Sequence, residues 1–94
     1  MKQGEKMKIK PGFKLKRENG ETYIVCDKSI NPSFNSTIIL TESSEYLWKM
    51  IQDGIVNKEQ LLNGLLDKFE ISAVLALSNI DIFIKTLKEN GILE

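Results

Sequence analysis

Residues 36–40 (STIIL) have the composition of a β-strand that could bond to a second chain. Between Ser36 and Thr41 there is no charged residue and no proline, the two features that usually keep an exposed strand edge from pairing with another chain. The N–H and C=O groups of such an edge can hydrogen-bond to an added peptide strand. The chemistry that this stretch offers is therefore recognition of a backbone.

Catalytic chemistry has little support in the composition. The chain has no histidine and one cysteine, Cys26, so an internal disulfide is impossible, and zinc, haem and His-based triads lack their usual ligands or base. A glycine-rich phosphate loop is also missing. We expect neither an enzyme nor a metal or cofactor site. Cys26 is expected to be a small buried hydrophobe rather than a reactive thiol.

The chain length and charge distribution suggest one small domain with a basic N-terminal part. No apolar run approaches the roughly 18 residues of a membrane span, and residues 1–10 lack the apolar centre of a signal peptide, so a cytoplasmic protein without membrane contact is expected. Residues 1–28 hold eight Lys and Arg against four Asp and Glu, a balance of +4, and the remainder has a balance of −4. We expect a flexible basic segment over residues 1–10 and a folded domain over residues 11–94.

A β-hairpin is predicted around Asn19-Gly20, because both residues tolerate the positive φ of a two-residue turn. Its strands are expected at residues 13–17 and 22–26, where apolar and polar residues alternate. The turn fixes the register and places Leu15 opposite Ile24 on the face that packs against the core.

The third strand is expected at residues 36–40, after a loop over residues 28–35. Short links between the strands indicate an antiparallel meander with the first and third strands at its edges. The first strand carries Lys14, Lys16 and Arg17, which discourage pairing with another chain. The third strand has no such protection, so it is the edge to which a second chain could add.

Three helices are expected to follow the strands. Their start signals are Thr41, Asn57 and Ser72, and the glycines Gly54 and Gly91 mark the ends of the first and third. The residues expected to be buried are Leu47, Trp48 and Ile51 in the first helix, Leu61, Leu62, Leu65, Leu66 and Phe69 in the second, and Leu77, Ile80, Phe83, Ile84 and Leu87 in the third.

The third helix has more apolar residues than one core stripe needs. Leu75 and Ile82 lie off the stripe, near Asn79 and Thr86 on the helical wheel. Apolar surface of this kind indicates a partner groove or a dimer contact, unless the helix is buried on several sides.

The order of strands, helices and matching residues resembles the PqqD-like family of peptide-recognition domains. The matches are Gly20, Tyr23 and Val25 in the hairpin, Leu40-Thr41-Glu42-Ser43-Ser44 and Leu47-Trp48 at the first helix, Asp53-Gly54, Leu61, Leu65 and Phe69 around the second, and Ile80, Phe83-Ile84, Leu87 and Gly91-Ile92-Leu93 at the end. They extend over about residues 8–94. Asn79 stands where the family usually has aspartate, and Thr41 where asparagine is common.

The resemblance implies an α+β fold of the winged helix-turn-helix type, with a three-stranded antiparallel sheet followed by three α-helices. It implies that the domain binds the leader of a ribosomally synthesised precursor peptide, which adds as an antiparallel strand to the third strand, and presents it to a modifying enzyme such as a radical SAM protein or a protease. The residues expected at the peptide are Ser36, Thr37, Ile38 and Ile39 on the strand and Leu75, Asn79, Ile82, Phe83 and Thr86 on the third helix.

Two other functions fit the same elements. In a winged-helix DNA-binding protein the second helix would read the groove, but its outward residues hold two basic residues (Lys58, Lys68) against three acidic ones, a poor match for phosphate. We therefore expect no nucleic-acid partner. In a homodimerising module the surplus apolar residues of the third helix would be buried against a second copy.

Overall fold

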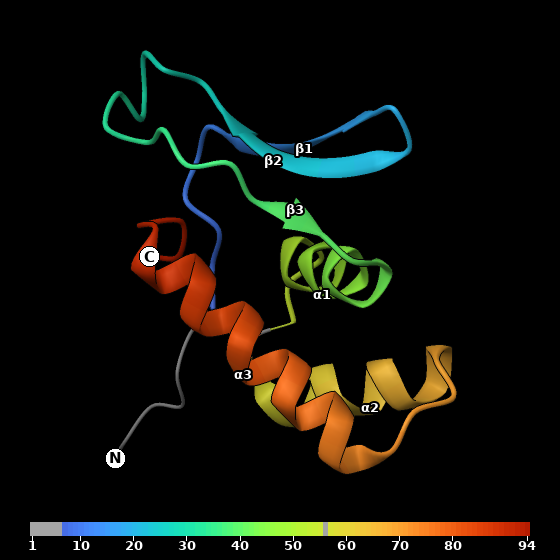
Figure 1. The fold of residues 1–94 in the computed structure, drawn as a ribbon. Helices are drawn as coiled ribbons and strands as arrows, with labels where there is room; N and C mark the ends of the chain where they lie inside the picture. The colour runs from blue at the N-terminus through green and yellow to red at the C-terminus, as the bar shows by residue number, and fades with distance from the viewer. Residues whose placement is uncertain (1–6, 56) are drawn as a thin grey trace, which may run out of the picture.

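The computed structural model describes residues 7–55 and 57–94, and in these ranges three antiparallel strands precede three helices (Figure 1). The α+β order predicted from the sequence is confirmed. The elements are β1 (Phe13–Glu18), β2 (Glu21–Cys26), β3 (Ile39–Leu40), α1 (Glu42–Gln52), α2 (Lys58–Lys68) and α3 (Ala73–Glu89).

The sheet has the order β1-β2-β3, and its first pair is the predicted hairpin. Leu15 lies opposite Ile24, as the turn requires. Asn19 and Gly20 form the turn with φ of 55° and 79°, the left-handed region in which asparagine and glycine are the residues that cost least.

β3 is shorter than the strand predicted over residues 36–40. It consists of Ile39 and Leu40, which pair with β2, and one further backbone bond joins Ile24 N to Ile38 O at 3.1 Å. Before that point the chain turns toward the end of α3, where the Ser36 hydroxyl donates to Asn90 Oδ1 at 2.6 Å. Ser36 therefore contacts a residue far along the sequence, two residues before the backbone bond at Ile38.

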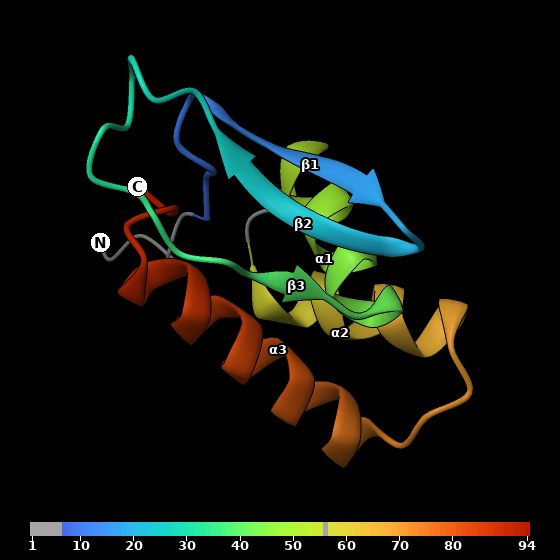
Figure 2. The same cartoon turned by 45° about the horizontal axis from the view of Figure 1, so that its top comes forward.

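The helices lie on one side of the sheet. In both views α1 lies next to the sheet and α2 lies farther from it, while α3 runs alongside β3 (Figures 1 and 2). Contacts of α1 with β3, α2 and α3 place it at the centre of the domain. Its predicted core residues Leu47, Trp48 and Ile51 are buried.

The core stripes of α2 and α3 differ in part from those predicted. Leu61 and Leu65 are fully buried in α2, whereas Leu62 and Phe69, also expected in the core, are half-buried against it. Leu66 is 38% exposed, because it lies one position off the stripe of Leu61 and Leu65. In α3 the buried stripe begins at Ala76, so Leu77, which was expected in the core, lies one position off it and is 41% exposed.

The predicted helix ends are confirmed. The side chains of Thr41, Asn57 and Ser72 each accept a hydrogen bond from the backbone N–H three residues on and so cap the three helices. Gly54 and Gly91 follow α1 and α3 with φ of 104° and 69°, the conformation in which glycine commonly ends a helix.

The N-terminal segment expected to be flexible is not separate from the domain over residues 7–10, and residues 1–6 lie outside the described residues. Met7 is buried, and Ile9 forms an antiparallel bridge with Leu93. Lys10 N donates to Ile92 O at 2.8 Å. The chain that returns after Gly91 supplies the backbone partners, which sequence periodicity does not reveal.

Replacing Trp48 by Ala is expected to lower the free energy of unfolding by about 3–5 kcal/mol, because a fully buried side chain is removed and a cavity remains. Chemical denaturation followed by circular dichroism measures the change. The exposed Gln52 at the end of the same helix is the matched control, and Gln52→Ala is expected to change stability by less than about 0.5 kcal/mol. A loss of less than about 1 kcal/mol for Trp48→Ala would contradict the central place of this residue.

Candidate functional site

A hollow of about 260 Å³ lies between β3 and α3. Ile38, Ile39 and Leu40 form its strand side, and the N-terminus of α1 contributes Thr41 and Ser44. The hollow follows the edge of β3 that does not face β2.

The backbone of β3 has one set of polar groups directed at β2 and one set directed at the hollow. Ile38 O accepts from Ile24 N, and Leu40 is paired with Thr22. Because N–H and C=O groups alternate between the two sides of an antiparallel strand, those of Ile39 point away from β2. The strand therefore directs one backbone donor and one backbone acceptor at the hollow.

α3 forms the opposite wall with Asn79, Ile82, Phe83 and Thr86. These residues recur every three or four positions, so they share one side of the helix. Phe83 is only 3% exposed and forms a floor continuous with the core, whereas Ile82 is 61% exposed at the rim. An apolar side chain entering the hollow would contact both.

The end of the hollow at α1 was not predicted from the sequence. Thr41 caps α1, and its hydroxyl accepts a hydrogen bond from Ser44 N at 3.2 Å. A strand that runs directly into a helix necessarily places the helix cap at the end of the strand. The adjacency of Leu40 and Thr41 is the signal that could have revealed these lining residues.

The structure brings most of the predicted contact residues together, but three lie elsewhere. Ser36 and Thr37 line a separate hollow on the outer face of the sheet, beside Tyr23 and Val25. Leu75 is 49% exposed and lies about one turn before Asn79, beyond the residues that line the hollow.

No charged side chain lines the hollow among the described residues. Its polar groups are hydroxyls and the Asn79 amide, so it can hydrogen-bond to a ligand but has no ion to pair with a charge. Burying an unpaired charge there would be costly. The hollow is therefore suited to an uncharged group.

The groups with shifted pKa values lie outside the hollow. The hydrogen bond that Tyr23 donates to Glu21 at 3.0 Å, with the charge of that carboxylate, raises the pKa of Tyr23. The hydroxyl and N–H of Ser29 donate to Asp27 and lower the pKa of that carboxyl. Neither shift marks a catalytic group at the site.

Other chemistry has little support in the described part of the chain. It contains no group of three or more His, Cys, Asp or Glu residues that could hold a metal ion. Cys26 is half-buried rather than fully buried as predicted, with Sγ 3.7 Å from Asn31 O. None of the described helices is long and apolar enough to cross a bilayer.

Further apolar surface lies at the start of α3, outside the hollow. Val74 is 79% exposed and Leu77 is 41% exposed. The outward face of α2 is polar and mixed in charge, as its sequence indicated, and Lys58 on it pairs with Asp81 at 2.9 Å. None of these residues lines the hollow.

A solved structure described as "TbiB1 in Complex with the TbiA(beta) Leader Peptide" is similar to this chain. The match covers 94% of this chain and 95% of that one, with a TM-score of 0.72 and 14% sequence identity. At this identity the similarity shows a shared fold. No family model matches the chain, and no curated protein matches it.

Replacing Ile82 by Glu is expected to leave the free energy of unfolding within about 0.5 kcal/mol of the wild type, because the side chain is at the surface. The matched variant Ile80→Glu is expected to lose more than about 4 kcal/mol, because it buries an unpaired charge. Chemical denaturation of both measures the difference. Similar losses in the two variants would contradict the exposure of Ile82 on α3.

Proposed function

We propose that this protein binds the leader region of a ribosomally synthesised precursor peptide by β-strand addition and presents it to a modifying enzyme. The protein acts in the cytoplasm as an adaptor, without catalysis or a cofactor of its own. The enzyme it serves is a radical SAM protein, a protease or another modifying enzyme.

The observation that carries the proposal is the one-sided pairing of β3. Its bonds to β2 leave the N–H and C=O of Ile39 directed at the hollow. A peptide strand can satisfy both groups, and backbone bonds of this kind give affinity that does not depend on the peptide's side chains. The strand edge and the helix wall together define a groove for one extended segment.

Side-chain selectivity would come from α3. A peptide paired with β3 places alternate side chains on the core side of the sheet, where Phe83, Ile82 and Asn79 line the hollow. Apolar side chains at these inward positions would be removed from water, while Asn79 can hydrogen-bond to a polar neighbour. The preferred leader therefore carries a short uncharged segment with apolar residues at alternate positions.

Two similarities support this function. The residue pattern resembles the PqqD-like family, whose members recognise precursor peptides. The fold is similar to that of TbiB1, which was solved in complex with the TbiA(beta) leader peptide. Leader binding is proposed for this chain because the groove between β3 and α3 has unpaired backbone groups on the strand and apolar and amide side chains on the helix.

The modifying enzyme has surfaces of its own to contact. Val74 and Leu77 are exposed outside the groove, and the hairpin carries Lys14, Lys16 and Arg17. An enzyme docked on either surface would leave the groove open to the leader. A second copy of the chain on the Val74 surface is the competing interpretation, with the homodimer as the functional unit.

Replacing Ile39 by Pro is expected to weaken peptide binding by more than about tenfold (1.4 kcal/mol). Proline removes the N–H that points into the groove, while the backbone bonds from β3 to β2 involve Ile38 and Leu40. The probe is a fluorescein-labelled peptide selected for binding to this protein from a library of random peptides, and fluorescence anisotropy measures its affinity. Ile39→Val keeps the N–H and is expected to bind as the wild type does.

Four outcomes would contradict the proposal. The library could yield no binder, or Ile39→Pro could bind the selected peptide as tightly as Ile39→Val while both variants keep the wild-type circular dichroism spectrum. A molar mass that doubles with concentration in light scattering, without peptide binding, would favour the homodimer. Salt-dependent binding to duplex DNA would favour a nucleic-acid partner.

A further inference from the structure

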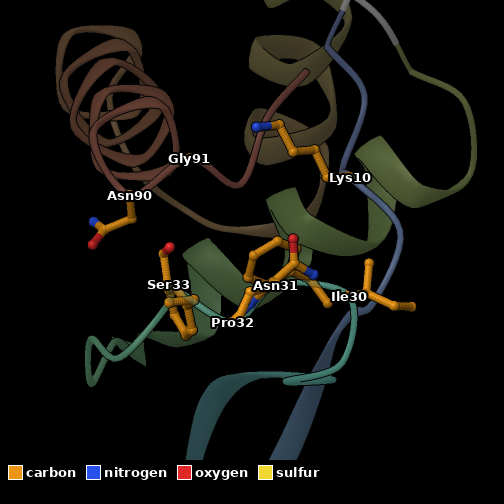
Figure 3. Close-up of a pocket in the computed structure, with 9 residues that line it drawn as sticks. Lys10, Ile30, Asn31, Pro32, Ser33, Asn90 and Gly91 are labelled. Atoms are coloured by element: carbon orange, nitrogen blue, oxygen red, sulfur yellow. The ribbon is translucent and has the colours of Figure 1, made fainter.

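A second hollow, of about 300 Å³, lies where the loop between β2 and β3 meets the end of α3. Its lining residues include Lys10, Asn31, Ser33 and Asn90 (Figure 3). In this view the side chains of Ser33 and Asn90 lie opposite each other, and Ile30 points away from them. The hollow is distinct from the groove between β3 and α3 but adjoins it.

The two hollows are in line along α3. Thr86 lines the groove, Asn90 lines the second hollow one turn farther on, and Asn90 Nδ2 donates to Thr86 O at 2.8 Å. The hydrogen bond from Ser36 to Asn90, 2.6 Å long, crosses from the chain before β3 to the helix at the boundary. A peptide leaving the groove at this end would cross the solvent side of this exposed bond to reach the second hollow.

The direction of β3 determines whether the N-terminal or the C-terminal part of the peptide lies at the second hollow. β3 runs from the end of α3 near Asn90 toward the cap of α1 at Thr41. A strand added antiparallel to β3 therefore runs from Thr41 toward Ser36. The part of the peptide that follows the paired segment in sequence lies at the second hollow.

The second hollow differs from the groove in charge. Among the described residues, Lys10 is the one charged residue that lines the second hollow. The ion pairs between described residues do not include Lys10. The main chain of Lys10 is held by the bond from its N–H to Ile92 O at 2.8 Å. Its flexible side chain ends in an ammonium group, which is suited to pair with a carboxylate that enters the hollow.

The remaining walls are compatible with an acidic side chain. The rings of Phe13 and Phe34 pack edge to face, with their centroids 5.1 Å apart. They give the hollow an apolar side for the methylene groups of the ligand. α3 ends here, and its C-terminal partial negative charge opposes an anion. The N–H groups of Gly91 and Ile92 already donate to carbonyls of the last turn, which reduces that opposition.

We propose that the second hollow binds an acidic residue of the peptide, located directly C-terminal to the segment that pairs with β3, with its carboxylate on the Lys10 ammonium. This inference rests on the proposed function. It adds the peptide's direction and a charge requirement that the uncharged groove does not impose. Lys10 is then a specificity-determining residue for the leader.

The test compares three synthetic peptides built on one sequence selected by the groove. One ends after the paired segment, one continues with an Asp-containing tail at the C-terminus, and one carries the same tail at the N-terminus. The C-terminal tail is expected to tighten binding to the wild type by about tenfold, and the N-terminal tail is expected to have no effect. Isothermal titration calorimetry measures the three affinities.

Charge-swapped variants identify the residue responsible. Lys10→Glu is expected to abolish the gain from the C-terminal acidic tail, to favour the same tail with Lys in place of Asp, and to bind the shortest peptide as the wild type does. Lys14→Glu makes the same charge change on an exposed residue of β1 that lines neither hollow, and it is expected to keep the gain. Thermal melting of both variants checks that the fold is retained.

The outcomes separate the two proposals. If the shortest peptide does not bind the wild type, or binds Ile39→Pro equally well, leader binding at β3 is wrong and the second subsite falls with it. If the shortest peptide binds as expected but the C-terminal acid gives no gain, or gives the same gain with Lys10→Glu, only the second subsite is wrong. A gain from the N-terminal tail instead would overturn the proposed direction.

Discussion

The pairing of β3 with β2 on one side only is the constraint on which the site depends. Backbone polar groups near a protein core need partners, and β2 supplies them for Ile38 and Leu40. The groups of Ile39 point the other way, toward α3. α3 leaves a hollow of about 260 Å³ there instead of closing on the strand. The two residues of β3, Ile39 and Leu40, thus complete the sheet and leave one edge of it unpaired beside α3.

The core keeps this edge in position. α1 begins immediately after β3 at the Thr41 cap, and Leu47 and Trp48 fix the helix in fully buried positions. On the far wall, Phe83 packs into the core while the adjacent Ile82 remains 61% exposed. One turn of α3 therefore serves both the fold and the groove. Phe83 in the core and the buried start of α1 hold the two walls of the groove in position.

Local signals in the sequence predicted most of the elements. Asn19-Gly20 specifies its turn by backbone conformation, and Thr41 caps a helix through its own side chain. The length of β3 could not be predicted in this way, because it depends on tertiary contacts. Ser36, just before β3, bonds to Asn90, 54 residues away. Met7 is buried for a similar reason, since the chain beside it pairs with the C-terminus.

The candidate site was predictable only where local sequence patterns determine which residues line it. Ile82 and Phe83 follow from helical periodicity, whereas the position of Leu75 depends on where α3 leaves the strand, which is a tertiary property. The exposed edge itself was visible in the uncharged residues before Thr41.

Residue-resolved amide hydrogen exchange, measured by NMR with and without a bound peptide, tests the central claim most directly. The Ile39 N–H is expected to exchange rapidly in the free protein and to become protected when a peptide binds, while the Leu40 N–H, which faces β2, is already protected and changes little. Equal exchange of Ile39 with and without bound peptide would contradict strand addition at β3.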